Sequence, residues 1–316
     1  MNGHAHGSFG YLPPMNERWG IFLAAGALLA CGACGGKGSS QTAAGGTGGG
    51  TGGMAVARTT PDPQYVPAVT GTCPAFTTGK NTFSPKGVQA RDVLLWVGAG
   101  SQPGPLVFFW HGAGGDPSEA PAALGAKAMA GIQAAGGIIA APYHDPANTV
   151  LPWFLTLGGT QEDDLQVADE ILACAIARKS VDMRRIQSVG FSAGAMNTEQ
   201  FMARRSGYLA SEVVYSGAQI GTPPVQDDTN AYPAMLFYGG PGDMVIVSFD
   251  SETHAYHDWM TMNGHFSFIC NHGMGHTVPT DGPDSAYQFL QDHPFGVSPE
   301  PYAKALPAGF PSYCSL

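Results

Sequence analysis

Residues 190–194 of this chain read Gly-Phe-Ser-Ala-Gly, a G-x-S-x-G pattern with Ser192 at its centre. The apolar run Ile186–Phe191 precedes the serine, and Ala195–Arg205 after it is compatible with a helix. A strand, a sharp turn and a helix in this order expose a serine hydroxyl at the tip of the turn. Because a free hydroxyl is a poor nucleophile, this interpretation requires a base, an acid that orients the base, and N–H donors for an oxyanion.

The base and the acid are predicted from residues that follow later strands. His276 lies in a glycine-rich loop after the last predicted strand, where its imidazole can be aimed at Ser192. Asp243 follows the apolar run Ala234–Tyr238, and we expect it to hold the tautomer of the imidazole and to stabilise its charged form. The order serine, aspartate, histidine is that of α/β-hydrolases. The alternatives are His272 for the base and Asp250 for the acid.

The oxyanion donors are predicted from a second glycine-rich loop. His111–Gly115 reads His-Gly-Ala-Gly-Gly and follows the apolar run Leu106–Trp110. Small residues let backbone amides approach a developing oxyanion, and the loop resembles the oxyanion loop of α/β-hydrolases. We assign the two donors to the amides of Ala113 and Ala193.

Metal and cofactor chemistry are not expected. His272 and His276 have H-x-x-x-H spacing, but no cysteine or acidic third ligand accompanies them at a useful distance in the sequence. The glycines between them also argue against a helix that would present both rings on one face. The mechanism outlined above needs no cofactor.

Apolar runs alternate with helical patterns along the chain, which predicts an α/β fold with a mostly parallel central sheet flanked by helices. Because ligands bind at the carboxyl ends of such strands, the motifs above are expected to meet at one edge of the sheet. Thr160 and Asp163 resemble a capping box at the start of one helix. The predicted strands are Val93–Val97, Leu106–Trp110, Gly137–Ala141, Ile186–Phe191, Glu212–Tyr215, Ala234–Tyr238 and His265–Cys270, and the predicted helices are Pro121–Ala135, Thr160–Arg178, Ala195–Arg205, Ser251–Met262 and Asp284–Gln291.

The N-terminal part predicts export. The apolar run Ile21–Ala30 after Arg18 is typical of a signal peptide, assigned to residues 1–30. Leu28–Cys31 resembles a bacterial lipobox, which predicts lipidation of Cys31; ordinary cleavage near Ala33 is the alternative. Residues 31–55 are rich in glycine, serine and threonine and are assigned as a flexible tether, and residues 56–316 as the catalytic domain.

The low charged fraction of 12% and the many glycines and prolines agree with a loop-rich extracytoplasmic protein. The formal net charge is −10 and no run of basic residues occurs, so nucleic acid is not an expected partner. A membrane is expected only through the lipid anchor. Four of the six cysteines lie in the catalytic domain and predict two disulfides, with three possible pairings. These cysteines are Cys73, Cys174, Cys270 and Cys314.

From about Leu106 to Thr280 the chain resembles the polyhydroxybutyrate-depolymerase/feruloyl-esterase-like branch of the α/β-hydrolases. The resemblance is carried by the His111–Gly115 loop, Ser192, Asp243 and His276. It implies a secreted or lipid-anchored serine esterase that acts on small or polymeric esters of feruloyl, acetyl-xylan or hydroxyalkanoate type. A serine peptidase, an acyltransferase or a non-catalytic surface-binding protein are the alternatives.

The substrate pocket is predicted from aromatic residues near these motifs. Trp110 ends the run before the oxyanion loop, and Trp153 follows a proline-rich loop. We expect both indoles to wall an acyl or aryl pocket.

Overall fold

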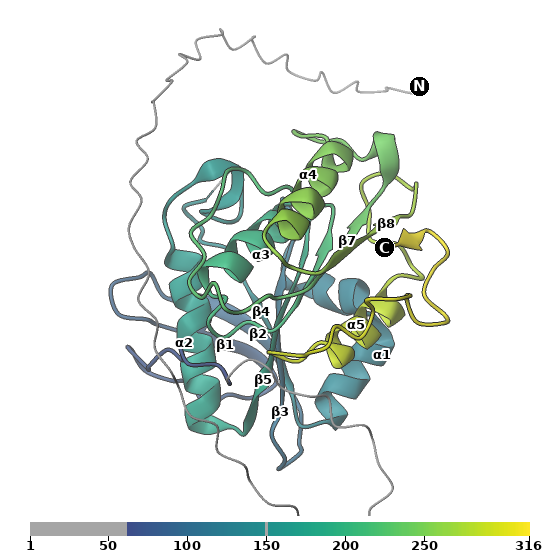
Figure 1. Cartoon of the computed structure of the whole chain (residues 1–316). Coiled ribbons are helices and arrows are strands. Elements are labelled where there is room, and N and C mark those ends of the chain that lie inside the picture. The colour runs from purple at the N-terminus through teal and green to yellow at the C-terminus, as the bar shows by residue number, and fades with distance from the viewer. Residues whose placement is uncertain (1–61, 149–150) are drawn as a thin grey trace, which may run out of the picture. The chain divides into compact units, whose positions relative to one another are not determined.

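The computed structural model describes residues 62–148 and 151–316 (Figure 1). The predicted signal peptide, the tether, Cys31 and the start of the predicted catalytic domain lie outside these residues.

A nine-stranded sheet forms the centre of the described part of the chain, in the order β1-β2-β4-β3-β5-β6-β7-β8-β9. The strands from β4 through β3, β5, β6, β7 to β8 pair in parallel, and β1, β2 and β9 add antiparallel partners at the edges. The mostly parallel sheet is therefore confirmed. The strands are β1 (Gly79–Phe83), β2 (Arg91–Val97), β3 (Gly104–Trp110), β4 (Ile138–Pro142), β5 (Val181–Phe191), β6 (Glu212–Tyr215), β7 (Ala234–Tyr238), β8 (Ser267–Asn271) and β9 (Cys314–Ser315).

Helices cover both faces of the sheet, as Figure 1 shows. The helices α2, α3 and α4 contribute to one apolar core, and α1 and α5 contribute to the core on the opposite face. The central strands read as continuous apolar runs because both of their faces are buried. The helices are α1 (Ala120–Ala134), α2 (Asp163–Arg178), α3 (Ala193–Arg204), α4 (Phe249–Met262) and α5 (Pro283–Asp292), with 3-10 turns η1 (Pro117–Glu119), η2 (Thr156–Gly158) and η3 (Gly240–Gly242).

Every predicted strand and helix is present, with ends that differ by a few residues. The sequence pattern missed β1 and β9, which are short edge strands with few apolar residues. The predicted cap at Thr160 was wrong, because α2 begins at Asp163 after Glu162 and no side chain caps it.

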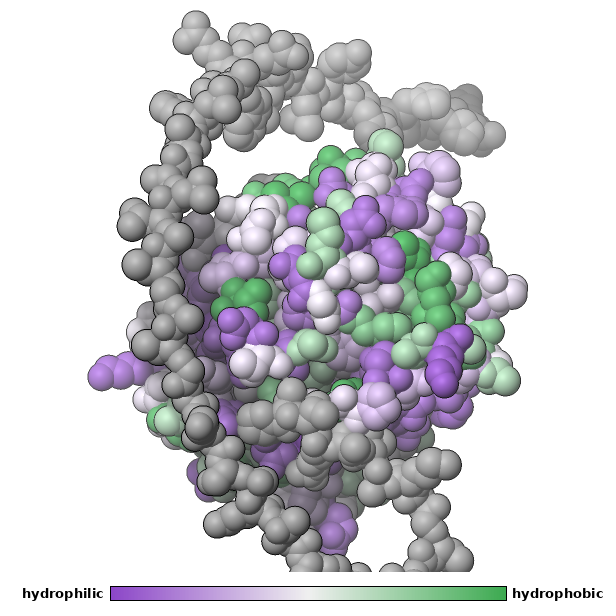
Figure 2. All heavy atoms as spheres, in the orientation of Figure 1, coloured by the Kyte–Doolittle hydropathy of each residue, from purple (hydrophilic) through white to green (hydrophobic). Residues whose placement is uncertain are grey.

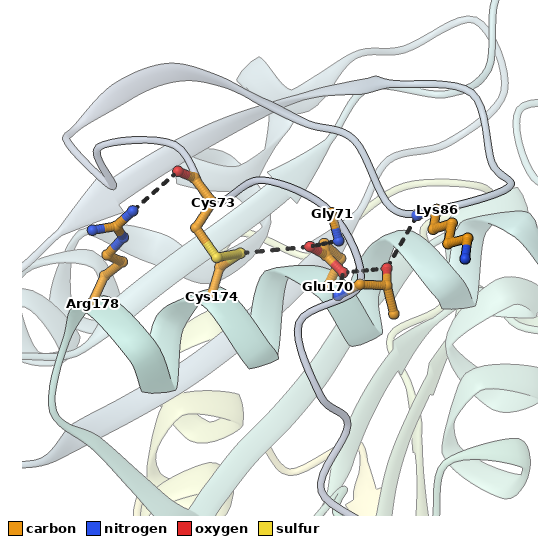
Figure 3. Close-up of a disulfide and its surroundings, with 7 residues drawn as sticks. Gly71, Cys73, Lys86, Glu170, Cys174 and Arg178 are labelled. Atoms are coloured by element: carbon orange, nitrogen blue, oxygen red, sulfur yellow. Dashed lines mark hydrogen bonds between the residues drawn. A yellow bond between two sulfur atoms is a disulfide. The ribbon is translucent and has the colours of Figure 1, made fainter.

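Two disulfides tie outlying segments to this framework. Cys73 pairs with Cys174 on α2, and Cys270 on β8 pairs with Cys314 on β9, so one of the three pairings left open by the sequence is selected. Figure 3 shows the first bridge beside Glu170, whose carboxylate accepts hydrogen bonds from the backbone N–H of Thr70 and of Gly71. The segment before β1 is thus held to α2 covalently and by a buried carboxylate.

The surface is mixed in character. Polar and neutral residues cover most of the face in Figure 2, with separate apolar patches, several of them along its upper edge. Within residues 62–148 and 151–316, no helix has the length and apolar character needed to span a bilayer.

Candidate active site

Ser192 lies in the turn between β5 and α3, in a strained conformation. Its backbone has φ 56° and ψ −123°, a region that residues with a side chain rarely adopt. The flanking glycines are required by close backbone contacts. A Cβ on Gly194 would lie 1.9 Å from the carbonyl oxygen of Trp110, and one on Gly190 would lie 2.2 Å from that of Gly194. The G-x-S-x-G spacing therefore forms a tight elbow that presents the serine hydroxyl.

His276 lies within hydrogen-bond distance of this serine. The Nε2 atom of His276 is 2.8 Å from Ser192 Oγ, and its Nδ1 atom is 2.7 Å from Asp243 Oδ1. Because an ionised carboxylate only accepts hydrogen bonds, Nδ1 carries the proton of the neutral ring and Nε2 accepts from the serine hydroxyl. Gly273 and Gly275 have positive φ angles of 69° and 71°, which let the loop turn the ring inward.

Asp243 is buried at the end of η3, where three donors satisfy its carboxylate. Besides the bond to His276, its Oδ2 atom accepts from Ser216 Oγ at 2.7 Å and from the Gly239 N–H at 2.8 Å. Burial favours the neutral acid, but the three hydrogen bonds outweigh this effect and lower the pKa of the Asp243 carboxyl. The carboxylate is therefore kept ionised beside the imidazole.

The alternatives for acid and base lie elsewhere. Asp250 contacts His254 on its own helix, with 3.3 Å between Oδ1 and Nδ1. His272 Nδ1 accepts from the Met274 N–H at 3.2 Å, so this ring holds its own loop. The structure thus brings Ser192, Asp243 and His276 together and leaves the two rivals out.

Ala113 and Ala193 line a cavity that also contains Ser192. Ala193 is the first residue of α3, so its N–H has no acceptor within the helix and lies at the positive end of the helix dipole. The loop of Ala113 is held by a Gly115 N–H bond to the Gly112 carbonyl and by a bond from the Gly112 N–H to Glu119 Oε2. Both predicted oxyanion donors therefore lie beside the candidate nucleophile.

His111, at the start of that loop, supports the loop backbone. His111 is buried, and burial lowers its pKa to about 4, so the ring is neutral near pH 7. Its Nδ1 atom lies 2.8 Å from the Gly112 carbonyl oxygen. It follows that His111 helps to shape the loop and has no direct contact with Ser192 among the hydrogen bonds of the described residues.

The prediction that Trp110 and Trp153 wall the pocket was wrong. Their exposed fractions are 0% and 1%, and both belong to the core on the α2–α4 face, to which α2, α3 and α4 contribute. The Trp110 Nε1–H donates to Ser188 Oγ, and the Trp153 Nε1–H donates to the His111 carbonyl. The indoles lie behind the loops of the site because their N–H groups find buried acceptors there.

The cavity at Ser192 is instead lined mainly by aliphatic side chains, together with those of Met196 and Phe249. Its volume is about 300 Å³, at the lower end for ligand pockets. On its outer edge Val245 and Ile246, two and three residues after Asp243 in the chain, are exposed by 60% and 58%. An exposed apolar rim of this kind is typical of a surface that meets an apolar ligand. The remaining lining residues are Ala113, Leu151, Leu157, Ser192 and Ala193.

Sequence reasoning missed Ser216 and Glu119. Ser216 follows β6 directly, so a polar residue at the carboxyl end of a parallel strand was the available signal. Glu119 lies at the end of η1, and nothing in the sequence marks its contact with Gly112.

In the described part of the chain, side chains of metal-binding type form one group of three. Cys73, Glu170 and Cys174 lie close together there, but the two cysteines form the disulfide of Figure 3 and offer no thiolate.

Comparison with known proteins shows the fold. No protein-family model matches the sequence, and no curated protein matches it. Among solved structures, a variant of pOPH in complex with DMSO superposes with a TM-score of 0.64 at 18% identity, over 77% of this chain and 95% of that chain. Native pOPH gives a TM-score of 0.63 at 19% identity, over 77% and 96%.

A thermostable esterase is similar with a TM-score of 0.53 at 17% identity, over 68% of this chain and 62% of that chain. These neighbours share the α/β-hydrolase fold, and the sheet order and the flanking helices agree with it. The chain therefore has an α/β-hydrolase fold.

Proposed function

We propose that this chain is a serine hydrolase that cleaves carboxylic esters through an acyl-enzyme. The observation that carries the proposal is the continuous hydrogen-bonded line from Ser192 through His276 to the buried Asp243. An apolar cavity next to the serine supplies a place for an acyl group. The names of two fold neighbours support the proposal of ester hydrolysis. One neighbour is called a thermostable esterase, and the other is a complex of a pOPH variant with pNPB.

The reaction follows from these positions. Ser192 Oγ attacks the ester carbonyl carbon while His276 Nε2 takes the hydroxyl proton, and Asp243 stabilises the charged imidazole. The N–H groups of Ala113 and Ala193 hold the oxyanion of the tetrahedral intermediate. His276 then gives the proton to the leaving alcohol oxygen, the C–O bond breaks, and the acyl group stays on the serine. Water attacks this acyl-enzyme by the same route and releases the acid.

The test compares hydrolysis of p-nitrophenyl butyrate by the full chain and by Ser192→Ala. We expect kcat to fall by about 10³-fold or more in the variant, because among the described residues only the Ser192 hydroxyl is hydrogen-bonded to His276 Nε2. Ser101→Ala is the matched control, since Ser101 is an exposed serine on the loop between β2 and β3. Equal rates for wild type and Ser192→Ala, with the control unchanged, would remove Ser192 from the mechanism.

Three further assays separate an esterase from the alternative functions. A serine peptidase cleaves the matching anilide at a comparable rate, and an acyltransferase transfers the butyryl group to an added alcohol faster than to water. A non-catalytic protein fails to react with a fluorophosphonate probe. Esters of feruloyl, acetyl-xylan and hydroxyalkanoate type are the substrate classes to screen once hydrolysis is established.

We further propose that the protein acts outside the cytoplasm, attached through a lipid on Cys31. The two disulfides support an oxidising compartment. Labelling with radioactive palmitate should mark the wild type and leave Cys31→Ser unmarked; equal labelling of both contradicts lipidation at this residue.

A further inference from the structure

Two cavities lie near His276, which lines one of them and contacts a lining residue of the other. The ring is stacked on Phe249 at 4.7 Å between centroids, and its other neighbour Phe191 lies at 5.0 Å. Phe249 lines the apolar cavity that contains Ser192. Phe191 and His276 line a second cavity of about 360 Å³, together with Phe109, Glu119 and the segment Thr277–Thr280. His276 thus lines the second cavity itself, contacts the first through Phe249, and lies 2.8 Å from Ser192 Oγ through its Nε2 atom.

The chemistry assigns one part of an ester to each space. The leaving oxygen must reach His276 to receive its proton, so the alcohol part belongs in the cavity that His276 lines. The carbonyl oxygen must lie at the Ala113 and Ala193 amides, which line the apolar cavity. The acyl chain therefore belongs in the apolar cavity and the alcohol part in the second one.

Glu119 is the carboxylate in the lining of the second cavity. Its Oε2 atom accepts from the Gly112 N–H at 3.2 Å. A Cβ on Gly115 would lie 1.9 Å from Glu119 Oε1, so the last glycine of the oxyanion loop leaves the space that this carboxylate occupies. Among the hydrogen bonds of the described residues, none reaches Oε1. One oxygen of Glu119 therefore holds the loop, and the other is available to a ligand in the cavity.

We infer that Glu119 selects the alcohol part of the substrate, favouring esters whose alcohol carries a further hydroxyl group that donates to Oε1. This inference rests on the proposed ester hydrolysis. A hydroxyl group donating to a partly buried carboxylate forms a charge-assisted hydrogen bond, which an alkyl alcohol cannot form. A plain alkyl ester would also displace water from Oε1 without replacing its hydrogen bond, and this penalty adds to the selectivity.

The experiment uses two esters of one acid, so that the acyl cavity is filled equally. Release of butyrate from glycerol 1-butyrate and from propyl butyrate is followed for the full chain by titration at constant pH. We expect kcat/KM to favour the glycerol ester by about tenfold or more, as a hydrogen bond to a charged group implies. The preference should appear mainly in KM, because the hydroxyl is bound before the chemical step.

Glu119→Gln separates selection from loop positioning. Glutamine keeps an oxygen that can accept from the Gly112 N–H, but it removes the charged acceptor from the cavity. We expect the ratio of the two kcat/KM values to fall to about two or less, since a neutral hydrogen bond contributes far less than a charge-assisted one. Asp228→Asn is the matched control: it removes a charge from an exposed residue that does not line the cavity, and it should leave the ratio unchanged.

Two results would overturn the inference while leaving the proposed function intact. One is a wild-type ratio near one, and the other is an equal loss on both esters in Glu119→Gln, which would make Glu119 a positioning residue for the loop alone. Failure of the wild type to hydrolyse either ester or p-nitrophenyl butyrate overturns the proposed function and this inference together.

Discussion

At the residue scale, the site depends on groups that hold the three central side chains in place. Asp243 is fixed by hydrogen bonds from Ser216 Oγ and the Gly239 N–H. Gly239 itself packs against the loop of His276, because a Cβ on Gly239 would lie 2.0 Å from the Gly275 carbonyl oxygen. A displaced carboxylate would misalign the imidazole, and a small misalignment costs much of the rate. Ser216 is therefore a positioning residue.

Replacing Ser216 tests this role. Its backbone φ is 55°, which glycine adopts without strain, so Ser216→Gly removes the hydroxyl without adding backbone strain. We expect kcat on p-nitrophenyl butyrate to fall by about tenfold, the equivalent of one hydrogen bond to a charged group, with KM nearly unchanged. Unchanged kcat, or a loss confined to KM, would contradict the role of Ser216.

At the scale of elements, the elbow requires the first turn of α3 to lie against the end of β3. The carbonyl oxygen of Trp110, the last residue of β3, occupies the space where a side chain on Gly194 would lie. The same approach places the Ala193 amide next to the loop that follows β3. Strand end, loop and helix start therefore form one packed unit.

Gly194→Ala tests this packing. A methyl group 1.9 Å from a backbone atom forces the helix away from the strand, which should destabilise the fold by about 1–3 kcal/mol or more and lower kcat by misplacing the Ala193 N–H. Thermal unfolding and p-nitrophenyl butyrate hydrolysis measure the two effects. The control is Gly242→Ala, because no atom lies within 4 Å of a Cβ at Gly242. Similar unfolding temperatures for the two variants would contradict the prediction.

At the scale of the whole molecule, the core on the α2–α4 face contains buried acids. Glu212 begins β6 with no exposed surface. Its Oε1 accepts from the Tyr256 hydroxyl on α4, and its Oε2 has no hydrogen-bond partner in the described part of the chain. Burial raises the pKa of Glu212 to about 8, and the bond from Tyr256 opposes this only in part. Burial and the proximity of Glu212 also raise the pKa of Glu199 on α3 well above its usual range. The Glu212 carboxyl is therefore mostly protonated in the folded protein at neutral pH.

The stability of the protein should therefore decline as pH rises from about 4.5 to about 8. In this range Glu212 loses its proton in the unfolded chain but keeps it in the folded protein, so each step in pH favours unfolding. The contribution of one such group is at most about 1.4 kcal/mol per pH unit. Urea unfolding of the wild type and of Glu212→Gln between pH 5 and pH 9 measures it.

Glu212→Gln should have a flatter dependence of unfolding free energy on pH, because glutamine does not titrate. Asp228→Asn provides the comparison, since Asp228 is exposed on the loop before β7. Identical slopes in the wild type and Glu212→Gln would show that Glu212 is ionised in the folded state.

Sequence alone determined the α-helices, the strands from β2 to β8, and the edge of the sheet at which the motifs of the site lie. The apolar runs are local patterns, and parallel pairing brings the ends of β3, β5, β7 and β8 to one edge, where the loops of Ala113, Ser192, Asp243 and His276 lie. Only the tertiary structure decided which side chains meet there. Ser216 and Asp243 are 27 residues apart, and their contact depends on strand order and register.

Contacts between distant segments also explain why the tryptophans do not line the pocket as predicted, and which of the three cysteine pairings forms. An indole near the site in the sequence lies inside the core when its N–H finds a buried acceptor, as Trp110 does at Ser188. Cys73 and Cys174 meet because the segment before β1 packs along α2. Such contacts are set by the packing of distant segments, which no local pattern of residues encodes.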